Sequence, residues 1–263
     1  MKMKILIITA VIITIATFTS CQKEPLTSFR ASKTTVVTGE VITFTNTTVD
    51  GYTYEWNFGD GTTSTLENPT HSYENAGIYN VLLTSFSKNG KKSSSSSITI
   101  TVTKANEIKY DGNNYPLTKG YLLKYGNWDG ETTYYNFDVW LVSDGITLTQ
   151  EDKIGTGNLI YLELWSSSPT SLNPGTYIFS NNYAAQTFAT GGVALNFNIE
   201  TEMGTLFDIC TGGNVIISQS GTDYIFDITL TLANGKTVNA YYKGSMIMYD
   251  QTGLKSNKKR FEK

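Results

Sequence analysis

The sequence contains few charged residues, one histidine and two cysteines, and each shortage excludes a class of protein. Charged residues make up 16% of the 263 positions, whereas aromatic residues make up 13%. Intrinsic disorder needs many charges and few aromatic side chains, so this composition argues against it. One histidine excludes a multi-histidine metal site, and two cysteines exclude a small disulfide-stapled domain. The net charge of −3 argues against nucleic-acid binding.

The sequence also lacks an apolar run long enough to cross a bilayer. The run from Ile5 to Phe18 has about 14 residues, and a membrane-spanning helix needs about 20. Lys2 and Lys4 precede this run and small residues follow it, which is the layout of a secretory signal peptide. We therefore predict a cleaved signal over residues 1–20, with a permanent transmembrane anchor as the alternative.

The segment that follows the signal contains the first of the two cysteines. Residues 18–21, Phe-Thr-Ser-Cys, resemble a bacterial lipobox, although Phe18 stands where Leu is usual. Residues 21–24, Cys-Gln-Lys-Glu, resemble the signal that sends lipoproteins of the Bacteroidota to the outer cell surface. The resemblance implies a surface-exposed outer-membrane protein anchored through acyl chains on Cys21, since buried methylenes hold such an anchor in the bilayer. Residues 21–27 would be the lipidated N-terminus and tether.

The remaining chain has the pattern of β-strands. From residue 40 to residue 250, apolar and polar residues alternate with period two, and no stretch keeps the helical period of 3.6. Asn89-Gly90 and Asn234-Gly235 predict two-residue hairpin turns, because Asn-Gly accepts positive φ at both central positions. The alternation predicts a last stretch of strand over residues 238–248, with a bulge or a close approach at Gly244. The predicted fold class is all-β.

The strands divide into two predicted domains. Residues 28–104 have the short strands of an N-terminal Ig-like β-sandwich, with Tyr52, Tyr54, Trp56 and Phe58 on one strand face. Residues 105–250 are expected to form a second, larger antiparallel β-sandwich or jelly-roll-like domain. Residues 251–263 form a basic tail, for which disorder is the expectation and contact with anionic glycans or lipid head groups the alternative.

Three sequence blocks of the first domain resemble the PKD domain. They are W-x-F-G-D-G at 56–61, P-x-H-x-Y at 69–73 and G-x-Y-x-V at 77–81. The matching residues are Trp56, Phe58, Gly59, Asp60, Gly61, Pro69, His71, Tyr73, Gly77 and Tyr79. Gly59 and Gly61 flank Asp60 in a turn where a Cβ would be strained, and an Asp side chain can bond turn amides. The resemblance implies a spacer or adhesion module, and it gives His71 a structural role; a ligand-binding or catalytic role is the alternative.

The second domain contains the candidate ligand site. If Phe137, Leu141, Leu162 and Leu164 point inward, the residues between them point outward. The candidate binding residues are Asp138, Trp140, Tyr161, Glu163 and Trp165. Aromatic rings stack on sugar faces and carboxylates bond hydroxyl groups, so a shared face would suit carbohydrate. The favoured interpretation is that a second sheet or the first domain covers these residues and makes them core or interface, and a sugar site is the alternative.

Residues for catalysis are scarce. Asp138 and Glu163 could form the carboxylate pair of a glycosidase if their separation suits it. The lone His71 lies in a PKD block, so we predict no Ser-His-Asp triad and no metal site. The sequence has no phosphate-binding glycine motif, and we expect no cofactor. Cys210 would have no intramolecular partner and is expected to be a small buried residue, with a reactive thiol as the alternative.

These observations predict a non-catalytic cell-surface lipoprotein. A PKD spacer would present a β-sandwich that binds an extracellular ligand, for which glycan is favoured. The alternative is a structural or accessory subunit of a surface protein complex, and a glycoside-active enzyme is the third hypothesis. The second domain also resembles a recurring β domain of Bacteroidota surface lipoproteins without assigned activity. That resemblance rests on residues 115–121, 172–177, 235–236 and 242–244.

Overall fold

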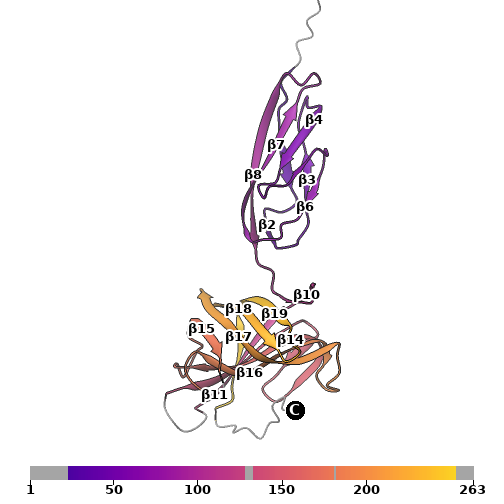
Figure 1. The fold of residues 1–263 in the computed structure, drawn as a ribbon. Helices are drawn as coiled ribbons and strands as arrows, with labels where there is room; N and C mark the ends of the chain where they lie inside the picture. The colour runs from indigo at the N-terminus through magenta and orange to yellow at the C-terminus, as the bar shows by residue number, and fades with distance from the viewer. Residues whose placement is uncertain (1–22, 128–132, 181, 253–263) are drawn as a thin grey trace, which may run out of the picture. The chain divides into compact units, whose positions relative to one another are not determined.

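The protein is built from β-strands. The computed structural model describes residues 23–127, 133–180 and 182–252, in which there are twenty strands and no helix (Figure 1). The chain divides into two compact units between Thr103 and Lys104. The all-β prediction is confirmed. Within the described residues, no helix has the length and apolar character to cross a membrane. The predicted signal peptide and Cys21 lie outside the described residues.

The N-terminal unit is a sandwich of two sheets. The smaller sheet has the order β1 (Phe29–Ala31), β3 (Ile42–Asn46), β6 (Thr70–His71). The larger sheet has the order β2 (Thr35–Val37), β8 (Ser93–Thr103), β7 (Gly77–Phe86), β4 (Thr53–Asn57), β5 (Thr63–Ser64). All pairings are antiparallel except that of β2 with β8, which is parallel.

Alternation along each strand produces the core of this unit. Trp56 is 1% exposed and packs edge-on against Phe29, with ring centroids 4.9 Å apart. Burial of each such large apolar side chain contributes about 1.5–3 kcal/mol. Tyr52 departs from the predicted face and is 61% exposed, because β4 begins only at Thr53. The alternation of buried and exposed side chains therefore holds within β4 and does not extend to Tyr52, one residue before the strand.

The C-terminal unit is one twelve-stranded sheet folded on itself. Its order is β10-β9-β19-β18-β17-β15-β16-β14-β12-β11-β20, and β13 pairs with β14. The first half of its strands in the sequence are β9 (Glu107–Tyr110), β10 (Asn113–Pro116), β11 (Lys119–Gly126), β12 (Tyr135–Val142), β13 (Ile146–Leu148) and β14 (Lys153–Ser166). The second half are β15 (Gly175–Phe179), β16 (Thr187–Asn198), β17 (Leu206–Ser220), β18 (Asp223–Leu232), β19 (Thr237–Gly244) and β20 (Met246–Asp250).

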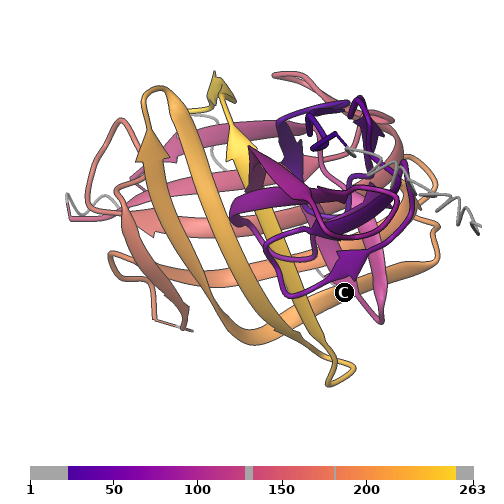
Figure 2. The same ribbon diagram turned by 90° about the horizontal axis from the view of Figure 1, so that it is seen from above.

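A change of partner along β17 creates the two layers. Leu206–Ile209 pair with β16, whereas Asn214–Ile217 pair with β15. Between them lies a bulge, followed by Gly213 at φ 123°. A Cβ on Gly213 would lie 2.1 Å from the Thr229 carbonyl oxygen, so this bend needs glycine. The part of β17 after Gly213, together with β18 and β19, consequently crosses over β11, β12, β14 and β16 at a steep angle, as Figure 2 shows for the orange and pink strands. A large apolar core lies between the layers.

Two local predictions were wrong. The last predicted strand breaks at Ser245, and β20 then joins the other layer, where it pairs in parallel with β11. Both Asn-Gly sites do form hairpin loops, but only Gly90 and Gly235 have positive φ. In each loop the glycine amide bonds the carbonyl three residues before it, at Ser87 and at Leu232. These are loops of the type I turn with a following left-handed glycine, a common alternative to the two-residue turn.

Candidate functional site

The predicted site residues lie together on one face of β12 and β14. In the antiparallel register, Asp138 is opposite Glu163 and Trp140 is opposite Tyr161. Trp165 is opposite Asn136. Directly opposed residues have their Cβ atoms on the same side of the sheet, within about 5.5 Å of each other. The two strands therefore bring together three aromatic rings, two carboxylates and one carboxamide.

This shared face is buried. The exposed fractions are 9% for Asp138, 1% for Trp140, 6% for Tyr161, 0% for Glu163 and 3% for Trp165. The side chains point away from the core between the layers, as alternation predicts, but they do not form an open surface. Trp140 and Tyr161 belong to a second apolar cluster with Tyr121, Ile146 and Phe197. β13, which pairs with the start of β14, contributes Ile146 to this cluster.

Surface side chains overlie both indole rings of this face. The Nζ of Lys153 lies 4.7 Å from the centroid of the Trp140 ring. The ring of Tyr183, which is 53% exposed, lies 4.9 Å from the ring of Trp165. The buried Nε1 of Trp165 has no hydrogen-bond partner among the described residues. Trp165 thus has a buried indole N–H, and its ring is in contact with a tyrosine at the protein surface.

The two carboxylates have little access to substrate. The Oε1 of the fully buried Glu163 accepts a hydrogen bond from Asn136 Nδ2 at 3.3 Å. A glycosidase must place a sugar bond between its two carboxyl groups and admit water on one side. Because Glu163 is 0% exposed and Asp138 is 9% exposed, this geometry gives no support to the glycosidase hypothesis.

An apolar groove lies beside the predicted face and shares Tyr161 with it. Its lining residues are Leu159, Tyr161, Thr190, Gly191, Gly192, Val193, Phe207 and Ile209. A Cβ on Gly192 would lie 2.7 Å from the Asp208 carbonyl oxygen, so the close approach of β16 to β17 needs glycine there. Sequence reasoning missed this groove. Its one signal is the Gly191-Gly192 pair inside a strand, which marks close backbone approach.

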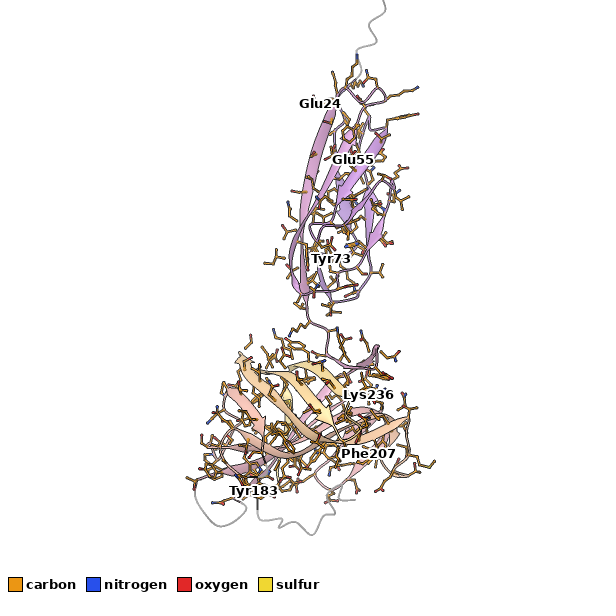
Figure 3. All side chains as sticks on the ribbon, in the orientation of Figure 1. Glu24, Glu55, Tyr73, Tyr183, Phe207 and Lys236 are labelled. Carbon is orange, nitrogen blue, oxygen red and sulfur yellow. The ribbon has the colours of Figure 1, made fainter. Side chains whose placement is uncertain are left out.

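Exposed apolar side chains also lie on the outer side of β17 and β15, two of them in this groove and two beyond the bulge of β17. We call Phe207, Ile209, Ile216 and Ile178 the β15–β17 patch; their exposed fractions are 37%, 47%, 47% and 59%. Figure 3 labels Phe207 on the C-terminal unit. Neighbouring residues Cys210, Val215, Ile217 and Tyr177 point inward and are buried. An exposed apolar row of this kind is typical of a surface that contacts another molecule.

The PKD blocks of the N-terminal unit form a hydrogen-bonded turn. Gly59 and Gly61 have φ of 85° and 94°. Between them, Asp60 Oδ1 accepts a hydrogen bond from the Thr62 amide at 3.0 Å, and Asp60 Oδ2 lies 2.7 Å from His71 Nε2. The His71 ring stacks on Phe58, with centroids 4.2 Å apart. The contact of His71 with the Asp60 carboxylate and the stacking of its ring on Phe58 therefore both hold the turn.

These contacts set the protonation of the turn. Partial burial alone would raise the pKa of Asp60, but the hydrogen bonds from Thr62 and His71 together outweigh it and lower that pKa below 3.8. Burial raises the pKa of Tyr73, whose hydroxyl donates to the Phe58 carbonyl at 2.8 Å. The turn therefore contains a carboxylate that stays ionised in mild acid.

Cys210 is a free thiol in the core of the C-terminal unit. It is 6% exposed, and burial raises its pKa to about 12. A thiol with such a pKa is protonated and unreactive at neutral pH. In the parts of the chain that the structure describes, no three His, Cys, Asp or Glu side chains gather where they could hold a metal ion.

Sequence comparison identifies relatives of the first part of the chain. Residues 22–102 match the family of the PKD domain. Collagenase ColA of Bacillus cereus is 34% identical over 116 residues, which are 42% of this chain and 12% of the collagenase. Collagenase ColQ1 of Bacillus cereus strain Q1 is 44% identical over 63 residues, 24% of this chain and 6% of the collagenase. This chain thus spans a small part of the length of both collagenases.

Two solved structures also align with the chain. The PKD1 domain of the Vibrio cholerae metalloprotease PrtV is 35% identical and covers 31% of this chain and 100% of its own, with a TM-score of 0.28. A chain from a structural study of carbohydrate-binding modules of the β-sandwich superfamily is 17% identical, covering 84% of this chain and 91% of its own, with a TM-score of 0.31. TM-scores of this size do not establish a shared overall fold. The sequence blocks, the two-sheet sandwich and the family match together show that residues 22–102 form a PKD domain.

Proposed function

We propose that this protein is a non-catalytic binding protein of the cell surface, anchored by a lipid on Cys21. The PKD domain is a spacer, and the C-terminal β-sandwich contacts an extracellular partner. The observation that carries this proposal is which side chains of the C-terminal unit are exposed and which are buried. Its paired carboxylates are buried, whereas the β15–β17 patch is open and apolar.

An apolar patch of this kind favours a protein partner. The groove at its start is lined almost entirely by apolar atoms and by the flat backbone of Gly191 and Gly192. Apolar groups of another protein can pack against such a surface, while a sugar needs hydrogen-bonding groups as well as rings. The proposal therefore corresponds to an accessory subunit of a surface complex.

Site-specific photo-crosslinking in the producing cells tests this proposal. A photoreactive residue at Ile178 is expected to give one discrete adduct, and the same residue at Lys243, on β19, is expected to give none. Ile209→Asp in the crosslinking protein should abolish the adduct, because a charge at the groove must be desolvated on binding. Equal adducts at both positions, or none at Ile178, would contradict a partner on this patch.

The lipid anchor requires its own experiment. Metabolic labelling with a palmitate analogue is expected to mark the wild-type chain and not the Cys21→Ser chain. At high salt the variant should also leave the membrane fraction, because it lacks the acylated cysteine that would hold the chain in the bilayer. A Cys21→Ser protein that stays with membranes at high salt would show another mode of attachment.

Glycan binding at the predicted face is the second candidate function. The specific observation in its favour is the buried Trp165 N–H without a partner among the described residues, beneath the exposed Tyr183. A buried donor of this kind is unusual and can serve a ligand hydroxyl. Movement of the Tyr183 side chain would give a sugar access to the Trp165 ring.

A polysaccharide panel with the full chain separates the two candidates. If glycan binds here, Trp165→Phe should weaken binding about fivefold through loss of the N–H, and Trp165→Ala should abolish it. Tyr52→Ala, at an exposed tyrosine of the PKD domain, is the matched control and should change nothing. No binding across the panel leaves the protein partner as the supported function.

A further inference from the structure

The first described residues of the chain are held tightly against one end of the PKD domain. Thr27 Oγ1 donates to the Ser94 carbonyl at 2.9 Å, and Ser94 Oγ donates to the Pro25 carbonyl at 2.5 Å. Leu26 and Val49 exchange two backbone hydrogen bonds, of 2.9 and 3.1 Å. Figure 3 shows Glu24 at this end and Tyr73 toward the opposite end of the domain. The direction in which the chain enters the domain is therefore fixed by the fold.

The β7–β8 loop, residues 87–92, lies at the same end and is basic. Ser94, which holds the start of the chain, is the second residue of β8 after this loop. The loop residues Lys88, Lys91 and Lys92 are all exposed. A shallow groove joins Lys88 to Lys23, Asp50 and Tyr52. Four lysines are thus placed around the start of the domain.

Apolar and aromatic side chains are exposed among these lysines. Leu26 is 71% exposed, Val49 is 56% exposed and Tyr52 is 61% exposed. Lys88 Nζ lies 5.9 Å from the centroid of the Tyr52 ring. Amphipathic tyrosine beside lysine is the combination found where proteins meet the interface of a bilayer. Two acidic groups lie among these lysines, Glu24 and Asp50, and Asp50 lies 3.7 Å from Lys23 Nζ. Glu55 and Glu67 line a separate groove that also contains Tyr52. The β7–β8 loop itself contains three lysines and no acidic residue.

The proposed anchor lies next to this surface in the sequence. Cys21 precedes Lys23 by two residues, so the chain between them spans at most about 7 Å. That distance is shorter than the screening length of about 8 Å at physiological salt. A lipid on Cys21 would hold the lysines where anionic head groups attract them.

From this arrangement we infer that the end of the PKD domain formed by Lys23, Leu26, Tyr52, Lys88, Lys91 and Lys92 is a docking surface for an anionic lipid membrane. The inference rests on the proposed lipid anchor and extends it. The anchor attaches the chain, and the docking surface sets the domain upright with this end against the head groups. The lipid phosphates are the recognised groups, and the tyrosine and leucine enter the interface beside them.

Vesicle sedimentation of the unlipidated protein tests the surface without the anchor. The probe is the chain from residue 21 with Cys21→Ser, mixed with phosphatidylcholine vesicles that contain or lack phosphatidylglycerol. We expect binding to the anionic vesicles alone, and its loss at high salt. Lys88→Gln, Lys91→Gln and Lys92→Gln together should lower binding at least about tenfold, since each lysine near an anionic surface contributes to attachment.

A charge-matched variant controls for net charge. Lys109→Gln, Lys236→Gln and Lys243→Gln together remove the same charge from the C-terminal unit and should leave binding nearly unchanged. An equal loss in both variants would overturn the inference, as would binding that persists in the loop variant through the basic residues 255–263. Thermal unfolding of both variants confirms that they are folded.

The proposed anchor and the proposed docking surface can be refuted independently of each other. Normal palmitate labelling of the wild-type chain with no anionic-vesicle binding by the Cys21→Ser chain would refute the docking surface and leave the proposed function intact. Selective vesicle binding without palmitate labelling would refute the anchor and leave the surface as an independent attachment.

Discussion

The two units of this protein use their polar side chains in different ways. In the PKD domain, Asp60 and His71 pair with each other at 2.7 Å in a turn whose partners all lie within 15 residues. In the C-terminal unit, Asn136 and Glu163 form a hydrogen bond across neighbouring strands and both are buried. The comparison teaches that a polar motif can be read from sequence when its partners are local. A motif whose burial depends on a distant strand cannot be read in this way.

The largest expected change in stability tests whether the shared face of β12 and β14, which includes Trp140, is part of the core. Trp140→Ala should lower the unfolding free energy of the C-terminal unit by about 3–5 kcal/mol, because it removes a fully buried indole. Ile247→Ala, at a side chain 45% exposed on β20, is the control and should cost less than about 1 kcal/mol. Denaturant unfolding followed by tryptophan fluorescence measures both. A Trp140→Ala chain as stable as the control would show an open face.

The next effect tests the glycine pair at the groove. Gly192→Ala should destabilise the C-terminal unit by about 1–3 kcal/mol, because the new Cβ would lie 2.7 Å from backbone oxygen. Gly212→Ala is the matched control on β17, where the nearest atom to a Cβ is 3.7 Å away. Thermal unfolding compares the two. If the two variants have the same melting temperature, β16 and β17 can move apart without a loss of stability.

The PKD turn should show a smaller, pH-dependent effect. The pKa of Asp60 is lowered from 3.8 in the folded state, so its contribution to stability is fully present above that value. The contribution is lost as the pH falls through the lower folded-state pKa. Asp60→Asn should therefore cost about 1 kcal/mol at neutral pH and progressively less in strong acid.

Unfolding of the PKD domain at neutral pH and in acid measures this difference. The control is Asp50→Asn, at an exposed carboxylate, which should give a nearly constant difference from the wild type. A constant penalty for Asp60→Asn at every pH would mean that shape, and not charge, holds the turn.

The smallest expected effect concerns the chemical reactivity of the Cys210 thiol. In a Cys21→Ser chain, Cys210 should resist a thiol reagent at pH 8 while the protein is folded, because its pKa is about 12. The same thiol should react at once in denaturant. Mass spectrometry follows the labelling over time. Fast labelling of the folded chain would indicate frequent opening between β17 and β16.

The sequence predicted more of the PKD domain than of the second unit. Trp56 and Phe58 were placed correctly in a sandwich core, because each strand there is short and is buried on one side. In the second unit, the alternation that placed Asp138 and Trp140 opposite the main core was correct. Alternation did not decide whether the other side is open or covered, because residues packed there, such as Ile146 of β13 and Tyr121 of β11, come from other strands.

Other missed features have the same origin. Gly213 was not recognised as the point where β17 changes partner, since its need for glycine comes from a contact with Thr229 on the next strand. The β19–β20 break at Ser245 was hidden because apolar residues continue on both sides of it. The groove at Gly191 and Gly192 likewise depends on which strand approaches them.

By itself, the sequence determined the all-β class, the PKD domain and the sharing of one face by Asp138, Trp140, Tyr161, Glu163 and Trp165. These follow from residue periodicity and from turns whose contacts are local. The tertiary structure decided which faces are open. It buried the predicted aromatic face, exposed the β15–β17 patch and gathered Lys23 with Lys88 at one end of the PKD domain. Exposure is decided at this level because it depends on what packs against a strand, and the strand's own side chains do not specify that.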